Sequence, residues 1–131
     1  MPILIAAFMA TGCAAQVDER EMNFLGSALT KLSASVHATV RFGAIPEGSS
    51  SEAVLQTSTD HDPELLRPFA GKLVKVQVVN KNSAVLVCDA ATGKALLEDS
   101  GCTAQMDSHR WTSGVNTQCE FTLNLQAICG R

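Results

Sequence analysis

The stretch LVKVQVVNKNSAVLVC, residues 73–88, decides the fold class of this chain. In its first half, valines alternate with Lys75 and Gln77, which is the pattern of a strand with one buried face. Residues 84–88 are continuously apolar, which indicates a more deeply buried strand. The intervening NKNS, residues 80–83, has the composition of a turn. The stretch therefore predicts two antiparallel strands joined by a short turn.

Further strands are expected toward the C-terminus. Residues 91–94 (ATGK) predict a second turn, and residues 95–97 predict a third strand. Near the end, Phe121, Leu123 and Leu125 alternate with polar residues, which predicts a last strand. The expected sheet is therefore an antiparallel meander of three or four strands with one face covered by helices.

A long helix is expected before the sheet, over residues 19–42. For its last part a strand is the alternative, because apolar residues also alternate at positions 36, 38, 40 and 42. Asp18 and Glu21 have the spacing of a capping box at the start of the helix, and Gly43 is a plausible stop. Within this range, apolar residues recur at steps of three and four, which places them on one helix face: Leu25, Leu29, Leu32, Val36 and Val40.

Two shorter helices are expected between the long helix and the sheet. Ser49 and Glu52 again have capping-box spacing, which predicts a helix over residues 50–58. Asp62 directly before a proline predicts a second, brief helix, which Pro68 and Gly71 are expected to end. The chain is therefore predicted to have an α+β fold, with N-terminal helices packed on a small antiparallel sheet.

The composition is that of one globular domain. The chain has 131 residues, of which 46% are hydrophobic and 18% charged, so it can form a core. The net charge is −3 and the ten Lys and Arg residues are scattered, which argues against a nucleic-acid partner.

The N-terminal stretch PILIAAFMATGCAA, residues 2–15, is apolar and uncharged. A membrane span needs roughly 20 apolar residues, so this run is too short to cross a bilayer but has the length of a signal-peptide hydrophobic region. It contains Ala10, Thr11 and Gly12 directly before Cys13, and this sequence resembles the lipobox of bacterial lipoproteins. The resemblance covers residues 1–15 and implies cleavage before Cys13 and lipid on its thiol.

This resemblance also implies a domain organisation and a location. Residues 1–12 would be a signal peptide, residues 13–17 a lipidated tether, and residues 18–131 a single globular domain. The residue after Cys13 is not Asp, which by the sorting rule of enterobacterial lipoproteins implies the periplasmic face of the outer membrane. The alternative is that residues 2–9 form a buried strand or helix of the domain.

The cysteine count agrees with the lipoprotein resemblance. Assigning Cys13 to lipid leaves an even number, all within residues 88–131: Cys88, Cys102, Cys119 and Cys129. In an oxidising compartment they predict two disulfides, each contributing about 2–4 kcal/mol. Three connectivities are possible. No Cys-x-x-Cys pair occurs, so neither a zinc site nor another metal or cofactor is expected.

Residues 102–119 form the most informative candidate for binding. This segment is polar and has His109, Arg110 and Trp111 at its centre. Trp and Arg are enriched at binding hot spots, and a loop closed by disulfides loses less entropy on binding. The alternative is that Trp111 folds inward and shares a core pocket with Met106.

No catalytic motif is found. The cluster at residues 59–62 includes His61, but its position favours a solvated loop between helices. His37 is expected to be a surface or core histidine. We therefore expect no enzyme, but an envelope protein that is held to the membrane by lipid and binds or assembles another envelope protein. The alternatives are a hydrolase inhibitor that uses residues 102–119 and an enzyme that uses His61 or His109 as acid or base.

Overall fold

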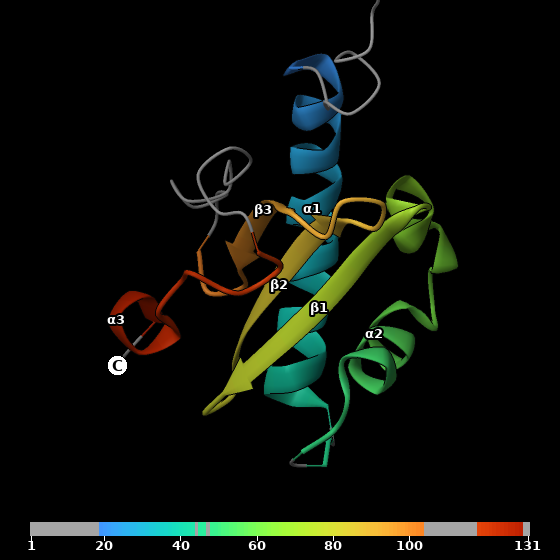
Figure 1. Ribbon diagram of the computed structural model, residues 1–131. Helices are drawn as coiled ribbons and strands as arrows, with labels where there is room; N and C mark the ends of the chain where they lie inside the picture. Colours follow the sequence, from blue (N-terminus) through green and yellow to red (C-terminus); the bar gives the residue numbers. More distant parts are fainter. Residues whose placement is uncertain (1–18, 44, 47, 104–117, 130–131) are drawn as a thin grey trace, which may run out of the picture.

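The computed structural model describes residues 19–43, 45–46, 48–103 and 118–129 (Figure 1). The predictions for Cys13, for the N-terminal segment and for His109, Arg110 and Trp111 lie outside these residues. The fold is α+β, as predicted. Its elements are α1 (Glu19–Phe42), α2 (Ser51–Thr59), the 3-10 helix η2 (Pro63–Phe69), β1 (Lys72–Val79), β2 (Asn82–Asp89), β3 (Ala95–Ser100) and α3 (Leu125–Cys129).

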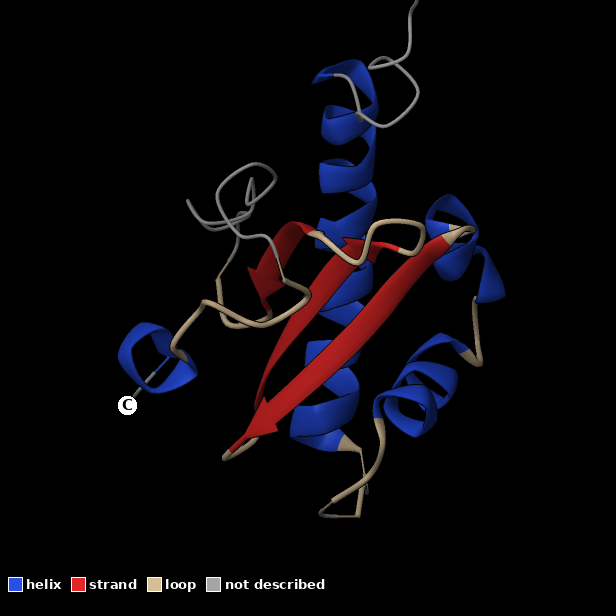
Figure 2. Cartoon of the chain, viewed as in Figure 1, coloured by secondary structure: helices blue, strands red, loops and turns tan. Residues whose placement is uncertain are grey.

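The three strands form an antiparallel meander in the order β1-β2-β3 (Figure 2). Val79 pairs with Asn82, so the first turn has only two central residues, Asn80 and Lys81. Both have positive φ, 51° and 67°, as in the type I′ turns that match the twist of a hairpin. Asparagine tolerates this conformation, whereas it is uncommon for lysine.

Helix α1 covers one face of the sheet and lies behind it in Figure 1. Leu29, Leu32 and Val36 have no exposed surface and pack with Val87 of β2 and Leu97 of β3. The predicted apolar face of this helix is therefore confirmed, and it forms the centre of the main core. Because each fully buried leucine or valine contributes roughly 1.5–3 kcal/mol, this contact makes a large contribution to the stability of the fold.

Helices α2 and η2 extend the same layer over β1. Val54 and Phe69 are buried in the main core, against partly buried valines of β1. Ser51 also joins α2 to β1 directly, because its Oγ accepts from the N–H of Val76 at 2.9 Å and donates to the carbonyl of Val76 at 3.2 Å. This contact occupies both backbone groups of Val76 at the edge of the sheet.

Both short helices were predicted, but some of their boundary residues differ. Ser50, not Ser49, caps α2, with its Oγ accepting from the N–H of Ala53 at 3.1 Å. Asp62 caps η2 as predicted, accepting from the N–H of Glu64 at 3.2 Å. Pro68 lies inside η2 rather than ending it, because its fixed φ is compatible with a 3-10 helix.

The second face of the sheet is covered by the C-terminal strap, which we define as residues 118–125. Leu86, Cys88 and Ala95 point to this side and pack with Cys119 and Phe121 of the strap. The strand predicted from Phe121 onward was wrong, since the strap is irregular until α3 begins. Two backbone N–H groups of the strap donate to the side chain of Glu98 in β3 rather than to the backbone of a neighbouring strand.

Candidate functional site

The two disulfides connect the C-terminal part of the chain to the sheet. Cys88 pairs with Cys119, and Cys102 pairs with Cys129, each with a Cα–Cα distance of 5.8 Å. The prediction of two disulfides is confirmed, and the structure selects one of the three possible connectivities. Cys88 lies near the end of β2, the central strand, and Cys102 lies two residues after the end of β3. The two bridges anchor the two ends of residues 103–118.

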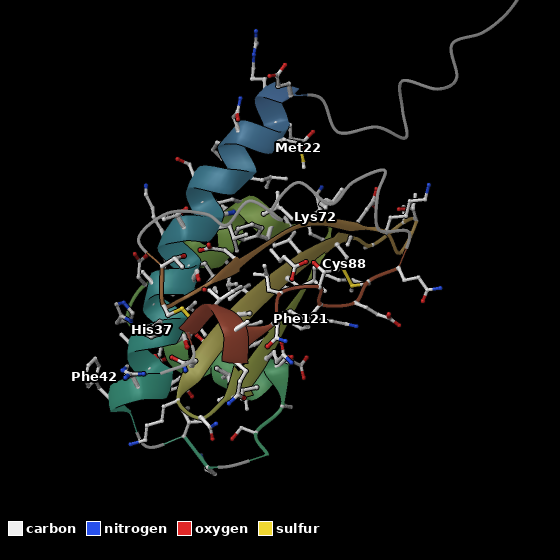
Figure 3. The ribbon with its side chains drawn as sticks, turned by 90° about the vertical axis from the view of Figure 1, so that its left-hand side faces the viewer. Met22, His37, Phe42, Lys72, Cys88 and Phe121 are labelled. Carbon is white, nitrogen blue, oxygen red and sulfur yellow. A yellow bond between two sulfur atoms is a disulfide. The ribbon has the colours of Figure 1, made fainter. Side chains whose placement is uncertain are left out.

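A buried carboxylate also attaches the strap to the sheet. Glu98 of β3 has no exposed surface, and its Oε1 accepts from the backbone N–H groups of Thr122 and Leu123, each at 3.0 Å. Its Oε2 accepts from the hydroxyl of Thr122. Lys75 of β1 adds a further contact, donating from Nζ to the carbonyl of Cys119 at 2.9 Å. Figure 3 shows Cys88 and Phe121 near each other on this side of the molecule.

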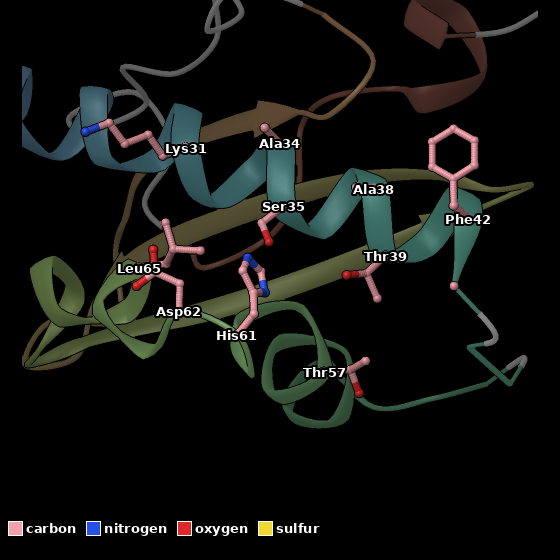
Figure 4. A pocket seen from close by; sticks show the side chains of 11 residues that line it. Lys31, Ala34, Ser35, Ala38, Thr39, Phe42, Thr57, His61, Asp62 and Leu65 are labelled. Carbon is pink, nitrogen blue, oxygen red and sulfur yellow. The ribbon is translucent and has the colours of Figure 1, made fainter.

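A shallow groove lies between α1 and the α2–η2 region, with a volume of about 680 Å³. Lys31, Ser35 and Thr39 belong to its α1 wall, while Thr57 and Leu65 belong to the opposite wall. The groove ends at Phe42, the last residue of α1, which is 83% exposed. Figure 4 shows Phe42 projecting away from the α2–η2 region. The groove therefore combines small side chains along α1 with one large exposed ring.

The polar groups in this groove do not form a catalytic pair. His61 reaches toward α1 near Ser35 (Figure 4), but in the described part of the chain it makes no hydrogen bond with a carboxylate. Asp62 caps η2 as predicted, and Ser35 donates to the carbonyl of Ser58 at 2.6 Å. No group of three His, Cys, Asp or Glu side chains suited to a metal ion occurs among the described residues.

His37 packs against the chain that follows β3. A Cβ atom placed on Gly101 would lie 2.5 Å from Cβ of His37, so the backbone approaches this histidine closely. Burial lowers the pKa of His37, and the nearby Arg41 lowers it further. Within the described residues, Nδ1 of His37 is buried without a hydrogen-bond partner. These contacts make His37 a packing residue between α1 and the end of β3.

Nothing matches this chain among protein-family models, curated proteins or solved structures. In the part of the chain that the structure describes, no helix is both long and apolar enough to span a membrane.

Among the residues of these sites, neither Glu98 nor Phe42 was given a role from the sequence. Glu98 follows three apolar residues in the strand ALLEDS, where a carboxylate suggests the end of a strand. The available signal was a single charged residue directly after a continuous apolar run. For Phe42, the signal was a large aromatic residue in the last turn of an amphipathic helix, outside its apolar face.

Proposed function

We propose that this protein is a lipid-anchored component of the bacterial envelope that binds or assembles another envelope protein and catalyses no reaction. The observation that carries this proposal is the groove that ends at Phe42. A phenylalanine that is 83% exposed buries little of its ring within the chain. Aromatic residues are enriched at protein interfaces, where such a ring would lose its contact with water.

The disulfides support the proposed compartment. Disulfides persist in oxidising environments such as the periplasm and are rare in the cytosol. The two bridges use four of the five cysteines, which leaves Cys13 for other chemistry. The small residues directly before Cys13 match what a lipoprotein signal peptidase requires. The proposed anchor and the observed pairing therefore account for every cysteine.

The proposed anchor precedes α1 in the sequence, whereas the groove ends at the last turn of this helix. Helix α1 has 24 residues, which corresponds to a length of about 36 Å. The proposed tether immediately precedes its first turn, and Phe42 ends its last turn. With lipid on Cys13, Phe42 would be available to a partner at the end of α1 distant from the tether.

An enzymatic function has less support from the site. Acid–base catalysis by a histidine needs a partner group or substrate held within hydrogen-bond distance. In the described residues, His61 has no carboxylate or cysteine partner of this kind. Its neighbour Asp62 is already used in capping η2.

Photo-crosslinking in the native cells tests the proposed binding function. A photoreactive residue at Phe42 is expected to yield a discrete adduct with another envelope protein. The matched control is Phe24, which is 58% exposed near the opposite end of α1 and is expected to yield no such adduct. Phe42→Asp should abolish the complex without changing the far-UV circular dichroism spectrum. The proposal fails if positions 24 and 42 give the same adducts or if neither gives one.

Mass spectrometry of the mature protein tests the proposed anchor separately. The expected chain begins at Cys13, carries diacylglycerol on that residue and has no free thiol among the other four cysteines. Cys13→Ala should release the protein from the membrane fraction while leaving both disulfides formed. A mature chain that retains residues 1–12 without lipid would contradict the anchor.

A second candidate function is inhibition of a hydrolase such as a lysozyme through residues 102–119. The specific observation in its favour is that each end of this segment is held by a disulfide, Cys102 to Cys129 and Cys119 to Cys88. This reduces the entropy that a binding loop loses. Inhibition measured on a panel of cell-wall hydrolases should be lost on replacing Arg110 and Trp111 by alanine. Unchanged inhibition by that variant would exclude this role for the segment.

A further inference from the structure

A polar cavity lies at the end of the molecule formed by the β1–β2 turn, the last turn of α1, and α3. It has a volume of about 280 Å³. Its walls include one guanidinium and three carboxamides: Arg41, Asn80, Asn82 and Gln126. Its described lining residues include no Asp or Glu. The side chains around this cavity therefore offer several N–H donors and one positive charge.

Arg41 is positioned by the turn but is not neutralised. Its Nη1 donates to the carbonyl of Lys81 at 3.2 Å and to Oδ1 of Asn82 at 3.3 Å. Within the described part of the chain, these two contacts of Arg41 are to neutral oxygen atoms, and no carboxylate pairs with its guanidinium. Both hydrogen bonds use Nη1, so among the described residues Nε and Nη2 have no hydrogen-bond partner. A planar guanidinium held in this way binds a carboxylate through two parallel hydrogen bonds.

A second cavity of about 310 Å³ continues from the first and shares Val79, Leu125 and Gln126 with it. We call the two together the C-terminal trough. Gln77 of β1 lines its second part, and in the described chain the buried Oε1 of Gln77 accepts no hydrogen bond. A buried acceptor without a partner is costly, so a donor supplied by a ligand would stabilise it.

We propose that the C-terminal trough binds the end of an extended peptide, with its free α-carboxylate on Arg41 and a peptide N–H on Oε1 of Gln77. Arg41 lines the first part of the trough and Gln77 the second, and Val79, two positions after Gln77 on β1, lines both. The amides of Asn82 and Gln126 supply the remaining polar contacts. This site is separate from the groove at Phe42 and does not depend on the function proposed for that groove.

Nuclear magnetic resonance titration of the full oxidised chain tests this proposal with two matched probes. These are acetyl-trialanine with a free C-terminus and the same peptide with a C-terminal amide. The free acid is expected to shift the side-chain signals of Arg41, Gln77 and Asn82. The amide is expected to bind about tenfold more weakly or worse, because it loses a charge-assisted pair with Arg41. Equal binding of the two peptides, or binding of neither, would overturn the proposal.

Single-residue variants test which end of the trough binds the carboxylate and which end binds the peptide group. Arg41→Gln should weaken the free acid about tenfold or more, and Arg41→Lys, which keeps the charge without the planar fork, should fall between. The matched control, Arg67→Gln, removes an exposed arginine paired with Glu64 and should bind as the unmodified chain does. Gln77→Leu should weaken the peptide but leave acetate binding unchanged.

Two further results would contradict peptide recognition. If inorganic phosphate bound as tightly as the free acid, the cavity would be a general anion site. If Gln77→Leu weakened acetate and peptide equally, the second part of the trough would have no role of its own. Circular dichroism of each variant separates loss of binding from loss of folding, and the comparison of acid with amide requires no variant at all.

Discussion

Replacing Glu98 by alanine should be among the most destabilising substitutions in this protein. The side chain is fully buried, and its carboxylate accepts from the N–H groups of Thr122 and Leu123 and from the hydroxyl of Thr122. Alanine would leave the two N–H groups without an acceptor. Each buried, unsatisfied group costs about 1–3 kcal/mol, and the partial exposure of Thr122 reduces the sum. We expect a loss of about 3–4 kcal/mol in the free energy of unfolding.

Two matched variants separate the hydrogen bonds from the charge. Glu98→Gln keeps one oxygen as an acceptor for both N–H groups, so the expected loss is only about 1 kcal/mol. Glu64→Ala removes an exposed glutamate whose ion pair with Arg67 is solvated, so the expected change is within about 0.5 kcal/mol. Urea unfolding of the oxidised proteins, followed by circular dichroism, gives all three values.

A double-mutant cycle tests whether the bond to Thr122 carries part of this energy. Thr122→Val removes the hydroxyl but keeps the backbone N–H, so Glu98→Ala and Thr122→Val should couple by about 0.5–2 kcal/mol. The reasoning would be refuted if Glu98→Ala cost less than about 1 kcal/mol. It would also be refuted if Glu98→Ala and Glu98→Gln cost the same, because the N–H groups would then not depend on an acceptor at this position.

Three further predictions concern the disulfides, the core and pH. Replacing Cys88 and Cys119 together by alanine should lower the free energy of unfolding by about 2–4 kcal/mol in urea titrations, and no change would show that the bridge is not formed. Leu29→Ala should cost about 2–5 kcal/mol in the same assay, whereas Phe42→Ala should change stability by less than about 0.5 kcal/mol; similar losses would contradict their burial. Because burial lowers the pKa of His37 from 6.5, the unfolded chain binds the proton more readily. This contribution to stability is therefore complete above pH 6.5 and declines as the pH falls below it, and His37→Gln should flatten that part of the curve, with an unchanged curve contradicting the assignment.

The helices and the first two strands could be predicted because their signals are local. Leu25, Leu29 and Leu32 recur with the period of a helix, and this face is the one that α1 buries. The Asp62–Pro63 pair marks the start of η2 for a similarly local reason, since the carboxylate caps an N–H two residues away. Such patterns depend on the geometry of one or two turns and need no distant partner.

The covering of the second sheet face depends on distant residues and could not be predicted in this way. Phe121 and Leu123 alternate as a strand would, but the neighbouring N–H groups bond to Glu98, which lies 24 residues from Thr122. The same acidic residue made β3 look shorter than it is. Backbone N–H groups outside a sheet and a carboxylate buried in a strand are each unfavourable without a hydrogen-bond partner. In this fold the N–H groups of the strap donate to the carboxylate of Glu98, so each is stabilised by the other.

The sequence by itself determined that the chain is an α+β domain with a long amphipathic helix, a turn within residues 80–83 and cysteines suited to two bridges. Its spacing patterns determine these features because each arises within a few neighbouring residues. Only the tertiary structure decided that Cys88 pairs with Cys119, that Glu98 holds the strap, and that Arg41 meets Gln126 around one cavity. These contacts join residues 24–85 positions apart, and only the packing of the whole domain brings such residues together.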